Sequence, residues 1–170
     1  TTTSTTLAAS LPAAEFKALN KAIEENNADR LKELISKNNI TSADIKDAEG
    51  VNPIERSLYE DHAEVLVPLL ALKLDPNYRD NRGRSYLDLA IHSDNKDVME
   101  VLVDSKKLNL DSQDPEGNTA LHLAVINVKP ALAQVLINGG ASKKIKNKKG
   151  QTPLELAKQD KNKKLLELLK

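Results

Sequence analysis

The chain has 170 residues, in which 25 Lys and Arg balance 25 Asp and Glu, and it contains no Cys. The balanced charge disfavours a wholly basic nucleic-acid-binding protein and an acidic solvating tail, and the lack of Cys excludes disulfides, Cys-ligated zinc and thiol catalysis. No apolar run approaches the roughly 18 residues that a membrane-spanning helix requires.

The first segment, residues 1–12, is rich in Thr, Ser and Ala and shows no periodic spacing of apolar residues. Such a segment cannot bury enough apolar area to offset the entropy lost on ordering, so we expect a flexible tail. The chain does not begin with Met, which indicates that a tag, an upstream region or a secretory signal preceded Thr1. We expect a single ordered domain over residues 13–170.

Residues 13–46 are expected to form a pair of helices. Two apolar stripes at helical spacing are separated by a polar turn at residues 26–29. The first stripe consists of Leu19, Ala22 and Ile23, and the second consists of Leu31, Leu34 and Ile35. Because only the tail precedes this pair, it has the position of an N-terminal cap.

Four glycines, Gly50, Gly83, Gly117 and Gly150, recur at intervals of 33 or 34 residues. The residues after each glycine agree in register, with an aliphatic side chain four residues on and a small one seven residues on. The aliphatic residues are Ile54, Leu87, Leu121 and Leu154, and the small ones are Ser57, Ala90, Ala124 and Ala157. Such a period indicates stacked repeats. We expect units at about residues 47–79, 80–113 and 114–146, with residues 147–170 as a lysine-coated C-terminal cap.

Each unit is predicted to contain two helices, as the unit at residues 114–146 illustrates. Thr119 precedes an apolar run at residues 120–125, where its hydroxyl can cap the first helix. After a polar break, residues 130–137 form the second helix, and Gly139-Gly140 ends it where the chain must become left-handed. The roughly ten polar residues before the next repeat glycine suit an extended turn or hairpin.

The unit at residues 47–79 departs most from this pattern. Pro68 falls inside its expected second helix, where it removes one backbone hydrogen bond and should kink the helix. Ser57 replaces the Ala found seven residues after the other repeat glycines. We therefore expect this unit to be the most distorted or the least stable one.

The repeated pattern Gly-x-Thr-Pro-Leu-x-x-Ala, with its period of 33 residues, resembles the ankyrin repeat. Residues 117–124 and 150–157 match it best, residues 83–90 replace its Pro with Tyr86, and residues 50–57 match more weakly. The resemblance covers about residues 16–170. It implies an all-α fold, an ankyrin-repeat solenoid of stacked helix-turn-helix units with hairpin or turn fingers and a cap at each end. It also implies a module that binds other proteins.

The resemblance further implies where a partner would bind. In the family, contacts cluster beside the repeat glycine and at the end of the first helix, on the concave face. The corresponding finger residues are Glu49, Val51, Arg82, Arg84, Glu116, Asn118, Lys149 and Gln151. The corresponding helix-end residues are Tyr59, Glu60, His92, Ser93, Ile126 and Asn127. Because Tyr and Arg offer a large contact area with polar reach, we add Tyr78 and expect the main anchors to be Tyr59, Tyr78, Arg82, Arg84 and His92.

We expect no catalytic residue, no cofactor and no metal, so the chain is predicted not to be an enzyme. The three histidines, His62, His92 and His122, occupy different repeat positions and should not converge on a metal. His122 occupies the His position of the family motif, where it is expected to form hydrogen bonds between neighbouring turns. Neither a Gly-rich phosphate loop nor the HExxH or GxSxG motif occurs, which argues against a small-molecule substrate.

Charge is unevenly distributed along the chain. Residues 143–170 contain ten Lys and three acidic residues, a surplus of seven positive charges. The segment is interpreted as a solvated cap, with an acidic partner, a nucleic acid or a lipid surface as alternatives. It contains no aromatic residue to stack on bases, which disfavours nucleic acid.

Two functional hypotheses remain from different classes. The first is a stand-alone adaptor or an inhibitor or immunity-type protein, monomeric by itself, that binds and blocks a partner protein such as an enzyme. The alternative is an ankyrin-repeat fragment of a larger regulatory or effector protein whose activity lies elsewhere. We expect a cytoplasmic protein, or a periplasmic or secreted one if a signal peptide preceded Thr1.

Overall fold

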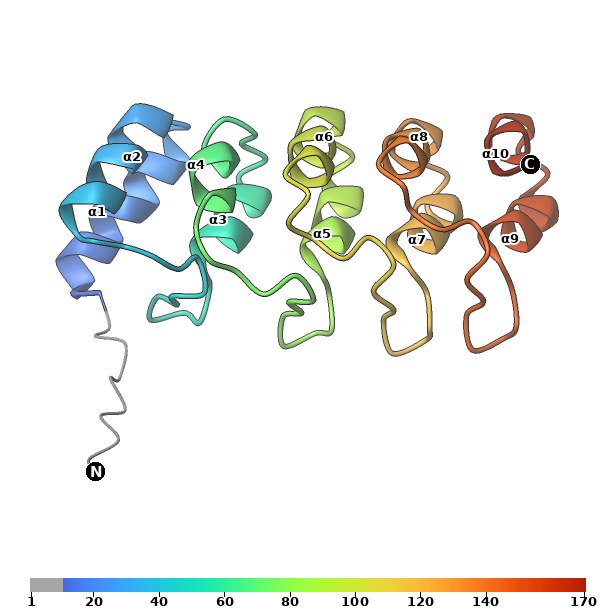
Figure 1. Ribbon diagram of the computed structural model, residues 1–170, viewed down its shortest axis with the longest axis horizontal. Coiled ribbons are helices and arrows are strands. Elements are labelled where there is room, and N and C mark those ends of the chain that lie inside the picture. Colours follow the sequence, from blue (N-terminus) through green and yellow to red (C-terminus); the bar gives the residue numbers. More distant parts are fainter. Residues whose placement is uncertain (1–10) are drawn as a thin grey trace, which may run out of the picture.

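The computed structural model describes residues 11–170, which form ten helices in five successive pairs (Figure 1). The helices are α1 (Ala13–Glu24), α2 (Ala28–Lys37), α3 (Pro53–Tyr59), α4 (Leu66–Leu70), α5 (Tyr86–Ser93), α6 (Lys96–Asp104), α7 (Ala120–Ile126), α8 (Pro130–Asn138), α9 (Pro153–Asp160) and α10 (Lys163–Leu169). Within this part of the chain no strand forms, and a single parallel bridge joins Ser42 and Lys73. The predicted all-α class is therefore confirmed. Most of the predicted tail, residues 1–10, lies outside the described residues.

The helices form two layers, with the odd-numbered helices in one and the even-numbered helices in the other (Figure 1). Each odd-numbered helix contacts the next odd-numbered helix, and each even-numbered helix contacts the next even-numbered one. Between successive pairs, a non-helical finger projects on the side of the odd-numbered helices. We call the face formed by the fingers and the odd-numbered helices the groove face.

A continuous apolar core fills the space between the layers. The aliphatic residue four positions after each of the first three glycines is at most 3% exposed. These residues are Ile54, Leu87 and Leu121. Because no helix pair can cover its own apolar face, each pair is stabilised by its neighbours, which is the physical basis of a solenoid.

The odd-numbered helices after the first pair begin with reciprocal capping boxes. In each, the N-cap side chain accepts a hydrogen bond from the N–H of the third helical residue, whose own side chain accepts from the N-cap N–H. The pairs are Asn52 with Glu55, Ser85 with Asp88, Thr119 with His122, and Thr152 with Glu155. The boxes start each helix directly after its finger, so they fix where finger and helix meet.

The predicted kink at Pro68 is wrong. Helix α4 has only 5 residues, the fewest among the ten helices, and Pro68 is its third residue. In the first turn a backbone N–H has no acceptor within the helix, so Pro68 removes no helical bond there. The helix starts late and does not bend. The unit is distorted, as predicted, but the distortion is a shortened second helix and not a kink.

The end of α8 also differs in detail from the prediction. Only Gly140 is left-handed, with φ of +99°, whereas Gly139 has ordinary helical geometry. Gly139 is needed for a different reason, because a Cβ there would collide with the Val103 side chain of the preceding unit. The two glycines therefore serve separate purposes, a turn and a close approach between units.

Candidate protein-binding surface

Each of the four fingers is closed by the same contact, three residues before its repeat glycine. A side-chain oxygen there accepts hydrogen bonds from the backbone N–H groups two and four residues further on, at 2.8–3.0 Å. The residues are Asp47, Asp80, Asp114 and Asn147. The glycines that follow have φ from +74° to +79°, which favours glycine. Sequence reasoning missed this closure, although an Asp or Asn before every repeat glycine was a visible signal.

The same contacts set the ionisation of two of these carboxylates. Although burial opposes the effect, the N–H groups of Arg84 and Arg82 and the Arg84 guanidinium lower the pKa of Asp80. At Asp47 burial again opposes the effect, but Arg56 and the N–H groups of the finger lower the pKa. Both carboxylates therefore stay charged as structural acceptors, and the finger backbone is held rigid.

The residue before each glycine forms the tip of its finger. These four residues, which we call the tip row, are all exposed and alternate in charge along the solenoid. The tip row consists of Glu49, Arg82, Glu116 and Lys149. Glu49 is bound by Arg56 at 3.0 Å. Within residues 11–170 the other three side chains form no ion pair, so they present their charges to solvent.

The residue after each glycine is less accessible than predicted. Val51, Arg84, Asn118 and Gln151 are half-buried. Arg84 binds Asp80 at 2.7 Å and the Tyr59 hydroxyl at 3.3 Å. The Asn118 side chain accepts a hydrogen bond from Asn147 at 3.0 Å, and the Gln151 carbonyl accepts one from His122 at 2.9 Å. These polar side chains and carbonyls hold the fingers together as well as bordering the surface.

The ends of the odd-numbered helices supply a second row. Tyr59, His92 and Ile126 occupy the same repeat position, nine residues after the glycine, and all three are exposed. We call them the helix-end row. The residues that follow them differ. Glu60 and Asn127 are exposed, but Ser93 is half-buried and its hydroxyl donates to the Ala90 carbonyl at 3.1 Å.

The structure does not place Tyr78 in either row. Its ring stacks on the buried Tyr86 with 4.7 Å between centroids, and the Lys46 ammonium lies 5.5 Å from the ring. Burial, followed by the nearby Glu55 carboxylate, raises the pKa of the Tyr78 hydroxyl. The expected anchor therefore packs between two units, because an aromatic ring gains more from stacking on Tyr86 than from water.

Two grooves bring the predicted residues together between successive fingers. The first, of about 350 Å³, contains Arg82, Arg84, His92, Glu116 and Asn127. The second, also of about 350 Å³, contains Glu116, Asn118, Ile126, Lys149 and Gln151. Glu116 borders both grooves. Each groove thus joins the tip row to the helix-end row, and both are open, with polar rims and an apolar residue, Leu123 or Leu156, in the wall.

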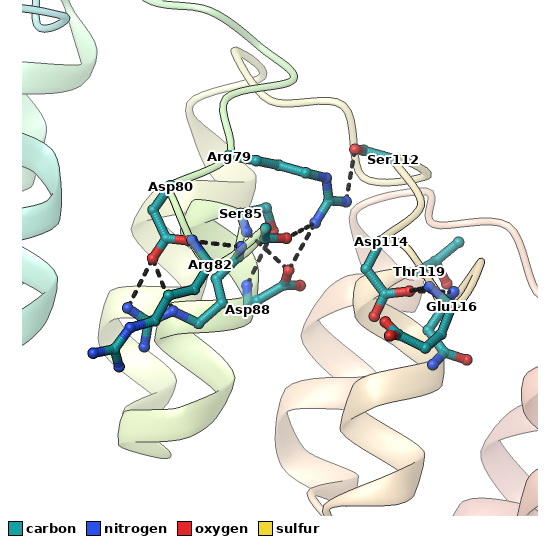
Figure 2. Close-up of polar contacts among 12 residues, drawn as sticks. Arg79, Asp80, Arg82, Ser85, Asp88, Ser112, Asp114, Glu116 and Thr119 are labelled. Carbon is teal, nitrogen blue, oxygen red and sulfur yellow. Dashed lines mark hydrogen bonds and ion pairs between the residues drawn. The ribbon is translucent and has the colours of Figure 1, made fainter.

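Arg79 joins the two fingers that border the first groove (Figure 2). Its guanidinium donates to the Gly83 carbonyl at 2.7 Å, to Asp88 at 3.1 Å and to the Ser112 hydroxyl of the next unit at 3.0 Å. Burial raises the pKa of Asp88, against the opposing effects of Ser85 and Arg79. In the next finger Gln113 has the equivalent place and bonds the Gly117 carbonyl and the Lys146 carbonyl. Successive fingers are therefore braced against one another.

The histidines do not converge. His122 bonds Thr119 within its turn and the Gln151 carbonyl of the next, as expected, while the His62 ring lies 2.8 Å from the Ile23 carbonyl. In the described part of the chain no cluster of three His, Asp or Glu side chains could hold a metal ion. None of the helices described has the length and apolar character needed to cross a membrane.

The comparison with known families shows that the chain belongs to the ankyrin repeat family. Residues 19–114 match the family model described as ankyrin repeats (3 copies). Residues 102–157 match a second model, described as ankyrin repeats (many copies). Ankyrin repeats are protein–protein interaction modules and are typically non-catalytic. The fold and the rows of exposed residues on the groove face agree with a module of that class.

Relatives of the chain include proteins of very different length. It is 29% identical to "Intracellular phospholipase A2" of Caenorhabditis elegans over 157 residues, which is 88% of this chain and 15% of that protein. It is 38% identical to human "Rabankyrin-5" over 66 residues, 39% of this chain and 6% of that protein. It is 33% identical to "Probable 26S proteasome regulatory subunit p28" of Saccharomyces cerevisiae over 156 residues, 89% of this chain and 68% of that protein. The chain thus spans only a small part of the first two.

Proposed function

We propose that the chain is an adaptor or inhibitor that binds one protein through its groove face, with the tip row and the helix-end row as the contact residues. The observation that carries this proposal is the repetition of exposed, differing side chains at two fixed positions of successive units. Arg82, Glu116 and Lys149 project from closed fingers, and Tyr59, His92 and Ile126 from helix ends. The backbone that carries them repeats, while the chemistry changes from one unit to the next.

Rigidity supports the same proposal. The side-chain closure of each finger, the capping boxes and the Arg79 and Gln113 braces leave few backbone groups free to reorder on binding. A surface that is already ordered loses less entropy when it binds a partner. The open grooves of about 350 Å³ suit protruding side chains of another protein better than an enclosed metabolite.

A second candidate is supported by the lengths of the relatives. The chain corresponds to 15% of the nematode phospholipase A2 and to 6% of Rabankyrin-5. These lengths favour an ankyrin-repeat region within a larger regulatory or effector protein. The yeast relative, of which the chain covers 68%, favours instead a protein made largely of repeats that docks on an assembly. In both cases the groove face is the proposed contact surface.

The test is charge reversal on the tip row. Arg82→Glu with Glu116→Lys should weaken binding of the native partner by at least about tenfold, because each reversed charge would face a like charge of a partner that complements the tip row. Neither side chain forms a hydrogen bond within residues 11–170, so the thermal midpoint should stay unchanged. Partners would be captured from the native source with wild type and variant in parallel, and their Kd measured by calorimetry.

The matched control is the exchange Lys96→Glu with Glu100→Lys on α6. This pair lies in the other helix layer, 2.6 Å apart, and the exchange preserves the ion pair and the net charge. The control should bind as wild type does. A captured partner whose Kd is the same for the wild type, the tip-row variant and the control would refute the groove face as its binding surface.

A further inference from the structure

The C-terminal part of the chain carries lysines that form no ion pair within residues 11–170. Ten lysines lie in residues 143–170, and nine of them are exposed, with Lys143 half-buried. All nine ion pairs in the described residues fall between Lys21 and Lys129. None of the ten lysines lies within 4.0 Å of a carboxylate in residues 11–170. We call these ten lysines the lysine surface.

The carboxylates of the same segment do not balance this charge. Glu155 accepts the N–H of Thr152 at 2.7 Å as part of its capping box. That N–H lowers the pKa of Glu155 although burial opposes the effect, and the charges of Lys146 and Lys158 lower this pKa further. Asp160 and Glu167 are exposed and form no ion pair in the described chain. The surplus of seven positive charges is therefore displayed to solvent.

The segment that carries the lysine surface forms one end of the solenoid (Figure 1, orange to red). Lys148 and Lys149 lie on the last finger, Lys158 and Lys161 lie at the end of α9, and Lys163 and its neighbour open α10. Helices α9 and α10 pack directly against each other. In contrast, the segment at residues 47–113 carries a surplus of six negative charges, so a charged partner would be oriented along the solenoid axis.

We propose that the lysine surface docks an acidic segment of a protein, a run of Asp and Glu side chains. Exposed lysine–carboxylate contacts are individually weak, so several must act together and binding must be sensitive to salt. A flexible acidic segment can meet dispersed lysines one after another, whereas a rigid partner would have to match their spacing.

The composition of the segment favours carboxylates over phosphates. Residues 143–170 contain no Arg, the side chain whose planar guanidinium binds phosphate in two-point contacts, and no aromatic residue on which bases could stack. None of the large exposed apolar side chains of residues 11–170 lies in this segment, so nothing there would insert into a lipid surface. An acidic polypeptide needs neither feature.

The experiment titrates the full chain with a capped peptide of about twelve alternating Glu and Asp residues, followed by amide NMR shifts. Shifts should concentrate in residues 143–170, and raising NaCl from about 25 to 300 mM should weaken binding at least about tenfold. The variant Lys148→Glu, Lys158→Glu, Lys163→Glu and Lys164→Glu should lose affinity for the peptide by at least the same factor. The control variant, of equal charge change at exposed unpaired lysines elsewhere, carries Lys17→Glu, Lys37→Glu, Lys73→Glu and Lys107→Glu. This control variant should lose much less affinity for the peptide.

Three outcomes would overturn the proposal. One is the absence of peptide binding at low salt, and another is equal loss in the two quadruple variants. The third is tighter binding of a twelve-base-pair duplex, or of phosphatidylserine vesicles, than of the acidic peptide. The variant Tyr59→Ala with His92→Ala provides the separation from the proposed groove-face function. It removes two residues of the helix-end row and changes no charge of the lysine surface, so it should bind the acidic peptide as wild type does.

Discussion

The units at residues 47–79 and 114–146 share their first helix and differ in their second. Helices α3 and α7 both have 7 residues and start with capping boxes, and both bury their leading aliphatic residue, Ile54 or Leu121, completely. Helix α8 has 9 residues, whereas α4 has 5. The first helix follows the finger and forms part of the groove face. The two units therefore agree in the helix that builds this face and differ in the helix of the other layer.

The chain leaves the two second helices by different routes. After α8, Gly140 turns the backbone and the Ala141 N–H bonds the Leu136 carbonyl at 3.0 Å. After α4 the equivalent residue is Lys73, whose N–H and carbonyl pair with Thr41 and Ala43 of the preceding segment. Backbone pairing with a neighbour thus replaces a glycine turn, and the next finger still starts in its proper place.

The polar bridge between units also differs. In the unit at residues 114–146, His122 bonds the Gln151 carbonyl across the junction at 2.9 Å. In the other unit the buried amide of Asn52 donates to the Tyr86 hydroxyl at 2.9 Å. The bridge is needed in both places, because a polar group buried between units must be hydrogen-bonded, but its chemistry is interchangeable.

Truncating the shared core position tests whether the distortion is confined to the second helix. Leu121→Ala and Ile54→Ala should each lower the free energy of unfolding by about 2–5 kcal/mol, because both leave a cavity at a fully buried site. Chemical denaturation followed by circular dichroism measures both. Ile126→Ala, at a side chain 47% exposed, should change it by less than about 0.5 kcal/mol. A loss under about 1 kcal/mol for Ile54→Ala alone would show that α3 is loosened as well.

The repeat register was predictable from sequence because it depends on local signals. A glycine that must be left-handed, an N-cap two residues later and aliphatic residues at helical spacing are each visible in one segment of chain. The two rows of the candidate surface follow from the same register, and the structure places all their residues except Glu49 and Tyr59 around two grooves. Their role in binding stays a prediction.

What sequence reasoning missed depends on contacts between units. Asn52 and Tyr86 each looked like a weak match to the repeat pattern, and the structure shows that they compensate each other through one hydrogen bond. Tyr78 was assigned to the surface because its stacking partner lies in the next unit's helix. Pro68 was expected to bend a helix, but packing allowed the helix to start later. Pairings of this kind are not visible in a single repeat.

Removing one partner of the Asn52–Tyr86 bridge should be costly. Tyr86→Phe leaves a buried amide N–H without an acceptor, so the free energy of unfolding should fall by about 1–3 kcal/mol. In the Asn52→Thr background, where Thr can still cap α3 and has no amide to satisfy, the same change should cost much less. A double-mutant cycle by denaturation gives this coupling. Additive losses would mean that the hydroxyl contributes independently of Asn52.

The bridge in the unit at residues 114–146 should make stability depend on pH, since it uses an imidazole. His122 accepts the Thr119 N–H at Nδ1 and faces the Gln151 carbonyl through Nε2, so the neutral form with its proton on Nε2 satisfies both contacts. Burial lowers the pKa of His122 below the ordinary 6.5. The folded state therefore binds this proton less readily than the unfolded state. Its contribution is complete above about pH 6.5 and is lost as pH falls through the folded-state pKa.

The variant His122→Gln isolates this dependence, because Gln can still form the capping box but does not titrate. The free energies of unfolding of wild type and variant would be measured by urea denaturation from pH 8 to pH 5. Their difference should shrink as pH falls below about 6.5, with a slope of at most about 1.4 kcal/mol per pH unit for one proton. Carboxylates titrate alike in both proteins and cancel in the difference. A difference that is constant over this range would show that His122 bridges the units without its protonation state affecting stability.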